Sequence, residues 1–289
     1  MKTVRLIFIF LFLTFNLNSF SEIYDDNINQ KNKDLWAKFY ERQAYYEVFE
    51  EGIETLETSE NLSTKAEIHS IFGAIFYKRT KYDLAEEELN KALNFNPNSK
   101  SAQWTISLVY SKTDRLEKGI KRLEKLAKEY PNDSQLLWVL GDLYFENKEF
   151  EKAIYNYEKI IGGVEVKKYK VEIKTLLENM IYIYMLKNDL ENAHKYMDKF
   201  LDYFPIDYKA LLLASEILMK LEKNREAIEK LDIVMDNFDP GKKYYFFMGQ
   251  AYYNLKEYDK AKYYTDESLK LDENYESALK LSSELNKIH

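Results

Sequence analysis

The residues that could take part in catalysis or metal binding are few and scattered. The three histidines, His69, His194 and His289, lie far apart in the sequence, and the chain contains no Cys. A metal site needs His, Cys or carboxylate ligands at short spacings, and a nucleophile needs a neighbouring base. The acidic run Glu86–Glu88 is most simply a solvated helix face. We therefore expect no catalytic residue, metal ligand or cofactor, and an enzyme with an unrecognised site is the least favoured class.

The composition favours long helices with a solvated, acidic surface. Of the 289 residues 46% are hydrophobic and 16% aromatic, whereas the chain has only eight Gly and four Pro to interrupt helices. The formal net charge is −7, and acidic and basic residues are interspersed. Nucleic acids bind clustered basic residues, so a nucleic-acid partner is not expected. No small-molecule substrate is expected either.

The first 21 residues have the three parts of a secretory signal peptide. A short basic start with Lys2 and Arg5 precedes an apolar run over residues 6–15, and a polar end carries the small Ser19 and Ser21. The apolar run is about half of the ~20 residues that a membrane-spanning helix needs. We predict that residues 1–21 are removed, that the mature chain starts at Glu22, and that it is exported to a periplasm. The alternative is an uncleaved leader that anchors the chain in the inner membrane.

A 34-residue period runs through most of the remaining chain. Position 8 of the period is mostly small, position 11 is mostly aromatic, and position 24 is mostly large and apolar, so it should reach the next unit. The small residues at position 20 would let two helices pack closely: Ala85, Gly119, Ala153, Ala193, Ala227 and Ala261. Six units follow from this register, with residues 168–173 as an insertion: 66–99, 100–133, 134–167, 174–207, 208–241 and 242–275.

This pattern resembles the tetratricopeptide repeat, a helix-turn-helix unit of 34 residues, here of an exported bacterial type. The resemblance implies an all-α fold, a right-handed superhelical solenoid of such helix pairs. Residues 22–33 are interpreted as a polar linker and 34–65 as a degenerate helical cap, helical over 34–58. We expect Thr64–Glu67 to form the capping box of the first unit. Residues 276–289 would form a capping helix whose apolar stripe covers the last unit.

In tetratricopeptide proteins the first helices of successive units line a concave groove, and positions 2, 5, 9 and 12 usually face the ligand. Positions 5 and 9 carry no Lys or Arg here, which argues against the carboxylate clamp of some family members. The resemblance therefore implies an aromatic, apolar groove for an amphipathic or extended peptide. The candidate groove residues are Tyr77, Trp104, Leu108, Trp138, Phe145, Tyr182, Leu212, Phe246 and Tyr253. The alternative is that Trp104 and Trp138 pack between helices.

These observations favour a binding protein over an enzyme. Our first hypothesis is a non-enzymatic adaptor of the bacterial envelope that binds a protein or peptide in the groove. The second is a structural scaffold in the periplasm that associates with copies of itself. Association that grows with concentration without a partner would distinguish the second from the first.

Overall fold

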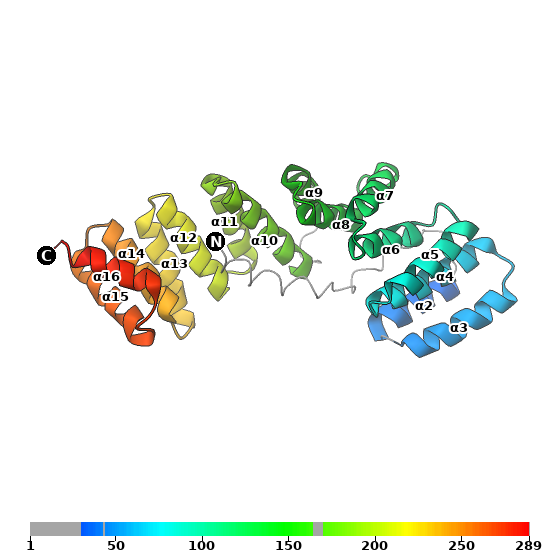
Figure 1. Ribbon diagram of the computed structural model, residues 1–289, viewed down its shortest axis with the longest axis horizontal. Coiled ribbons are helices and arrows are strands. Elements are labelled where there is room, and N and C mark those ends of the chain that lie inside the picture. Colours follow the sequence, from blue (N-terminus) through cyan, green and yellow to red (C-terminus); the bar gives the residue numbers. More distant parts are fainter. Residues whose placement is uncertain (1–29, 43, 164–169, 289) are drawn as a thin grey trace. The chain divides into compact units, whose positions relative to one another are not determined.

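The computed structural model describes residues 30–42, 44–163 and 170–288, and in these ranges it contains fifteen α-helices and no strand (Figure 1). The predicted signal peptide and most of the predicted linker lie outside them. The chain divides near residue 164 into two compact units, and each is described by itself. No helix in the described part of the chain is long and apolar enough to cross a bilayer.

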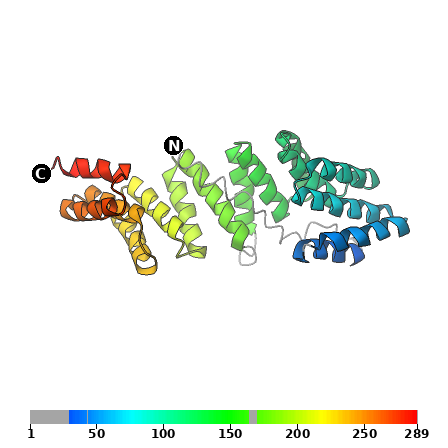
Figure 2. The ribbon, with the colours of Figure 1, turned by 60° about the horizontal axis from the view of Figure 1, so that its bottom comes forward.

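The first unit consists of eight helices in which each helix packs against the next (Figure 2). Their bounds are α2 (Gln30–Arg42), α3 (Tyr45–Thr58), α4 (Leu62–Lys78), α5 (Tyr82–Phe95), α6 (Lys100–Ser111), α7 (Leu116–Glu129), α8 (Ser134–Glu146) and α9 (Phe150–Gly163). The cap region thus forms two helices, and α2 takes in the last residues of the predicted linker. Both α2 and α3 also pack on α4.

The second unit consists of seven helices in the same order of packing. Their bounds are α10 (Lys170–Leu186), α11 (Leu190–Tyr203), α12 (Tyr208–Lys220), α13 (Asn224–Asn237), α14 (Lys242–Asn254), α15 (Tyr258–Leu271) and α16 (Glu276–Leu285). In α16 the side chains of Ala278, Leu281 and Leu285 are buried, whereas Ile288 beyond its end is 41% exposed.

The predicted period sets the spacing of the helix pairs. We call the first helix of each pair the A helix and the second the B helix. The B helices α5, α7, α9, α11, α13 and α15 begin at the same repeat position, 34 residues apart except for one step of 40. Helix α10 has 17 residues against 13 in α8 and α12, so part of the insertion lengthens this A helix.

Every A–B turn of the six repeats contains a residue in the left-handed conformation. At position 15 the φ angle lies between 53° and 63° in all six pairs, at Thr80, Asp114, Lys148, Asn188, Glu222 and Lys256. The backbone N–H one residue later donates to the carbonyl of position 11, for example from Lys81 to Phe76 at 2.9 Å. This hydrogen bond closes a Schellman motif, which usually places Gly at the left-handed position. Because none of the six is Gly, residue types at these positions do not predict the turn.

Small residues bring the two helices of a pair close together, as predicted. A Cβ atom on Gly73 would lie 2.5 Å from Cγ of Leu89, and one on Gly141 would lie 2.6 Å from the ring of Tyr157. The large side chain at position 24 therefore fills the space beside the small residue at position 8 of the same helix pair. Leu89 also belongs to a buried cluster with Ala102 of the next pair, as expected for a side chain that joins two units.

The N-terminus of α4 differs from the prediction. The helix begins at Leu62, and the side chain of Asn61 accepts a hydrogen bond from the backbone N–H of Thr64 at 3.0 Å. The predicted capping box at Thr64–Glu67 is wrong, because these residues lie within the helix. Glu67 is buried and accepts hydrogen bonds from Nε1 of Trp36 at 3.2 Å and Oγ of Ser101 at 3.1 Å. Its carboxyl group joins α2, α4 and α6, since a buried polar group needs such hydrogen-bond partners.

A polar link that repeats in both units ties one A helix to the N-cap of the next. Lys100 forms an ion pair with Asp133, and Lys174 forms one with Asp207 at 2.7 Å. Both aspartates are N-caps, and each accepts a hydrogen bond from the first turn of its own helix. The link therefore holds successive A helices in register.

We predict that Gly119→Ala lowers the free energy of unfolding by about 1–3 kcal/mol, the usual cost of overpacking. A Cβ atom there would lie 2.6 Å from the backbone carbonyl oxygen of Ser107, which cannot rotate away. Gly162→Ala is the matched control, because nothing lies within 4 Å of a Cβ at that position of α9. It should be neutral or raise the stability by up to about 1 kcal/mol. Urea unfolding followed by circular dichroism measures both, and equal effects would contradict the prediction.

Candidate functional site

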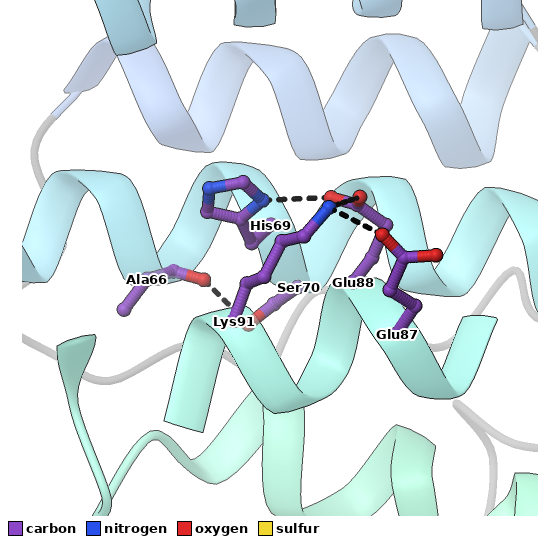
Figure 3. A network of polar contacts seen from close by, with 6 residues as sticks. All are labelled: Ala66, His69, Ser70, Glu87, Glu88 and Lys91. Carbon is purple, nitrogen blue, oxygen red and sulfur yellow. Dashed lines mark hydrogen bonds and ion pairs between the residues drawn. The ribbon is translucent and has the colours of Figure 1, made fainter. Parts of the chain in front are cut away.

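A polar network joins α4 to α5 in the first unit (Figure 3). Nδ1 of His69 lies 2.7 Å from Oε2 of Glu88, and Nζ of Lys91 lies 2.7 Å from Oε1 of the same carboxylate and 2.8 Å from Oε1 of Glu87. The His69 ring also stacks on Phe95, with the centroids 5.6 Å apart. Both partners of the His69–Glu88 contact are only 14% exposed, so the network serves helix packing.

The acidic run at Glu86–Glu88 is not simply a solvated face. Glu86 accepts two hydrogen bonds from the guanidinium of Arg115, at 2.9 and 2.7 Å, and so joins α5 to the start of α7. Glu87 alone is largely exposed. Within the described ranges no group of three or more His, Cys, Asp or Glu side chains could hold a metal ion.

We predict that Glu88→Gln destabilises the protein by about 1.5–3 kcal/mol at neutral pH, the size of a hydrogen bond to a charged group. Burial alone would raise the pKa of Glu88, but the hydrogen bonds from His69 and Lys91 outweigh it, and the pKa lies below its ordinary value of 4.5. A lowered carboxyl pKa stabilises the fold above that ordinary value. The contribution is lost as the pH falls through the folded-state pKa of Glu88.

Urea unfolding of the wild type and Glu88→Gln at pH 7 and at successively lower pH tests this. The difference in stability should shrink as the pH falls below 4.5, the ordinary carboxyl value. Glu87→Gln removes the same charge from the more exposed neighbour and should change stability less at pH 7. A difference that stays constant over this pH range would contradict the prediction.

The predicted groove residues of the first unit are mostly committed to packing. Trp104 and Leu108 are each only 2% exposed. Tyr77, Trp138 and Phe145 are half-buried. The ring of Tyr77 packs on Tyr82 and that of Phe145 packs on Phe150, each pair with centroids 6.0 Å apart. These contacts join the A helix to its own B helix across the turn.

In the second unit, Tyr182, Phe246 and Tyr253 are half-buried, and Leu212 is 7% exposed. Phe246 meets Tyr275 edge to face at 5.6 Å, and both Phe246 and Tyr253 pack against the buried cluster that contains Leu281 of α16. The last helix thus covers part of α14.

Positions 5 and 9 of the repeat distinguish the two units. In α4, α6 and α8 all of these side chains are buried except Trp138, whereas in α10, α12 and α14 all are half-exposed except Leu212. We define the second-unit A face by the half-exposed side chains at positions 5, 9 and 12: Glu178, Tyr182, Met185, Glu216, Met219, Phe246, Gln250 and Tyr253. Apolar and polar groups alternate on this face.

Two carboxylates lie on the second-unit A face. Burial raises the pKa of Glu178, and the charge of Asp207 adds to the rise, while Lys174 and Lys209 act in the opposite direction. Glu178 on α10 is therefore close to the start of α12, where the Lys174–Asp207 ion pair joins the two helices. Glu216 lies 3.0 Å from Lys220 on its own helix.

The repeat register assigns both glutamates to groove positions, although the predicted groove names only aromatic and aliphatic residues. The same is true of Met185 and Met219 at position 12. The repeat register could have identified these two glutamates and two methionines, because it assigns positions 5, 9 and 12 to the groove whatever residue occupies them.

Comparisons with known proteins agree with this architecture. The tetratricopeptide-repeat family matches residues 105–163 and 242–281. The C-terminal part of a tetratricopeptide-repeat protein from Cytophaga hutchinsonii is similar in structure, with 16% identity, a TM-score of 0.63, and coverage of 86% of this chain and 98% of that one. A tetratricopeptide-repeat protein from Parabacteroides merdae aligns over 89% of this chain and 99% of that one, with 16% identity and a TM-score of 0.50.

A third solved structure is YrrB, described as a tetratricopeptide-repeat protein with an unusual peptide-binding site. It has 17% identity and a TM-score of 0.57, and the alignment covers 68% of this chain and 99% of that one. Identities this low establish the fold and nothing finer. The comparison with curated proteins found no match.

Helix pairs of constant register, packed in series, define the class of helical repeat proteins. Together with the family matches they make this chain a tetratricopeptide-repeat protein with an all-α solenoid fold. Such repeats indicate a protein–protein interaction adaptor, and the family is typically non-catalytic.

Proposed function

We propose that this chain is an adaptor that holds a peptide segment of a partner protein on the second-unit A face. The observation that carries the proposal is the difference in exposure between equivalent positions of the two units. At positions 5 and 9 the first unit has buried side chains except Trp138, whereas the second leaves Tyr182 and Phe246 half-exposed. Met185 and Met219 at position 12 of the second unit add to this half-exposed surface. Tyr and Met are frequent in interfaces because they present large contact areas.

The carboxylates suggest the charge of the segment. Partial burial raises the pKa of Glu178, so its ionised form is poorly solvated where it stands. A Lys or Arg side chain of the partner would compensate that charge. A second basic side chain of the partner would replace Lys220 as the ion-pair partner of Glu216. The segment that fits best is amphipathic, with apolar groups against Tyr182 and Met219 and basic groups against the glutamates. A neighbour in fold, YrrB, is described as binding a peptide.

A defined peptide pair tests this proposal. We would titrate the protein into a fluorescent amphipathic peptide of Leu and Lys, roughly 18 residues and five helical turns long, and follow the anisotropy. The same peptide with Glu in place of Lys is the comparison. We expect the Lys peptide to bind at least ~10-fold more tightly, a difference of about 1.4 kcal/mol, because Glu178 and Glu216 attract Lys and repel Glu.

The double variant Glu178→Gln/Glu216→Gln should remove most of that preference, and Tyr182→Ala should weaken both peptides. The control is Glu191→Gln/Glu273→Gln, which deletes two exposed carboxylates away from the face. Equal binding of both peptides by the wild type, or the same loss in the control variant, would argue against this face as the site.

We also propose that the adaptor is exported and acts in a bacterial envelope. The support is the basic, apolar and polar order of residues 1–21, which lie outside the described residues. The intact mass of the protein recovered from a periplasmic extract should correspond to a chain that starts at Glu22. Replacing Leu11 and Leu13 by Asp should keep the protein in the cytoplasm as the full-length chain. A full-length product in the wild type, whether soluble or in the inner membrane, would exclude cleavage.

A further inference from the structure

Two B helices carry opposite charges at the same repeat positions. The helices are α7 in the first unit and α13 in the second (Figure 1). At positions 18, 19, 22 and 29, α7 has Glu117, Lys118, Lys121 and Lys128, whereas α13 has Arg225, Glu226, Glu229 and Asp236. Every one of these eight side chains is exposed. We call the two sets the α7 stripe and the α13 stripe.

The two stripes form few ion pairs, although Nζ of Lys118 lies 4.2 Å from the centre of the Tyr110 ring. Within the described part of the chain, the single ion pair that involves either stripe joins Glu226 to Lys223 at 3.9 Å. At position 19 of two other B helices the exposed lysine is paired: Nζ of Lys152 lies 2.6 Å from Glu149, and Nζ of Lys260 lies 2.8 Å from Glu257. Helix α15 has a charge order similar to that of α7, but Lys260 and Lys270 already have partners on or beside their own helix.

The like charges on α13 also act on one another. The pKa of Asp232, which lies between stripe residues on this helix, is raised by burial first and then by the negative charges of Asp236 and Glu229. A basic surface placed against α13 would relieve the repulsion.

We propose that two copies of this chain associate through the α7 stripe of one copy and the α13 stripe of the other. When the two helices lie side by side in the same direction, like repeat positions face each other, and the pairs at positions 18, 19, 22 and 29 have opposite charges. Position 25 is acidic in both helices, at Glu124 and Asp232, but Glu124 already accepts a hydrogen bond from Oη of Tyr144 at 2.5 Å. Such helices would be in contact over about 17 Å of their length, at 1.5 Å per residue. The contact uses B helices, so it goes beyond peptide binding on the A face and does not depend on it.

The reversal at position 18 strengthens the case for a second copy over another anionic partner. A generic anionic surface would favour a uniformly basic stripe, but α7 places Glu117 beside three lysines, and α13 places Arg225 beside three acids. This pattern matches the partner stripe position by position. The contact is polar and therefore weak, with surface ion pairs of about 0–1 kcal/mol each, and sensitive to salt.

Sedimentation equilibrium of the full chain, purified from the compartment where it accumulates, tests the proposal over roughly 10 µM to 1 mM. The mean mass should rise with concentration at low salt, and at about 0.5 M salt, where the Debye length is only a few Å, it should fall back to that of the monomer. A mass that stays monomeric at low salt over this range would overturn the proposal.

Charge reversal identifies the surfaces. One variant is Lys118→Glu/Lys121→Glu/Lys128→Glu, and the other is Glu226→Lys/Glu229→Lys/Asp236→Lys, each checked for unchanged helicity. Each alone should associate at least ~10-fold more weakly than the wild type. An equimolar mixture should associate again, because the acidic α7 of the first then faces the basic α13 of the second. A mixture that stays monomeric, or variants that assemble like the wild type, would overturn the proposal.

Two further measurements separate a contact between copies from a membrane contact and from a change within one chain. Binding of the wild type to vesicles of anionic phosphatidylglycerol, lost in the α7 variant and unaccompanied by a rise in mass, would assign the α7 stripe to a membrane surface instead. A salt-dependent change in the dimensions of the single chain at constant mass would likewise exclude a contact between copies.

Discussion

The close approach of the two helices in each pair is the constraint on which the structure depends. Gly73 and Gly141 have no room for a Cβ atom because Leu89 and Tyr157 fill the space above them. Leu89 is also buried in a cluster with Ala102 of the next pair. Packing density within a pair therefore fixes how one pair stacks on the next, since a core this dense tolerates little change in volume.

Polar contacts refine the register that packing sets. The left-handed turn between A and B helices and the ion pairs from Lys100 and Lys174 to the next N-cap recur at fixed repeat positions. They satisfy backbone groups at helix ends that would otherwise lose hydrogen bonds. Because the groups at the helix ends already take part in these contacts, the surfaces left for partners are the sides of the A helices and the outer sides of the B helices.

The two units share the same helix-pair architecture but differ in which A-helix side chains are buried. In the first unit, bulky or neutral residues such as Trp104 and Leu108 close the A-helix positions. In the second, Glu178 and Glu216 occupy equivalent positions and stay half-exposed, because a carboxylate is costly to bury without a partner. The proposed peptide site follows from which A-helix side chains stay half-exposed, and the proposed contact between copies follows from the exposed charges of α7 and α13.

The sequence by itself determined the helix pairs, their 34-residue period and the close contact at positions 8 and 20, because these depend on residue size at fixed spacing. It did not reveal the start of α4, since both Asn61 and Thr64 are good caps and the structure places the cap hydrogen bond at Asn61. Nor could it say which groove residues stay accessible. Exposure depends on what neighbouring helices cover, and that is a property of the tertiary structure alone.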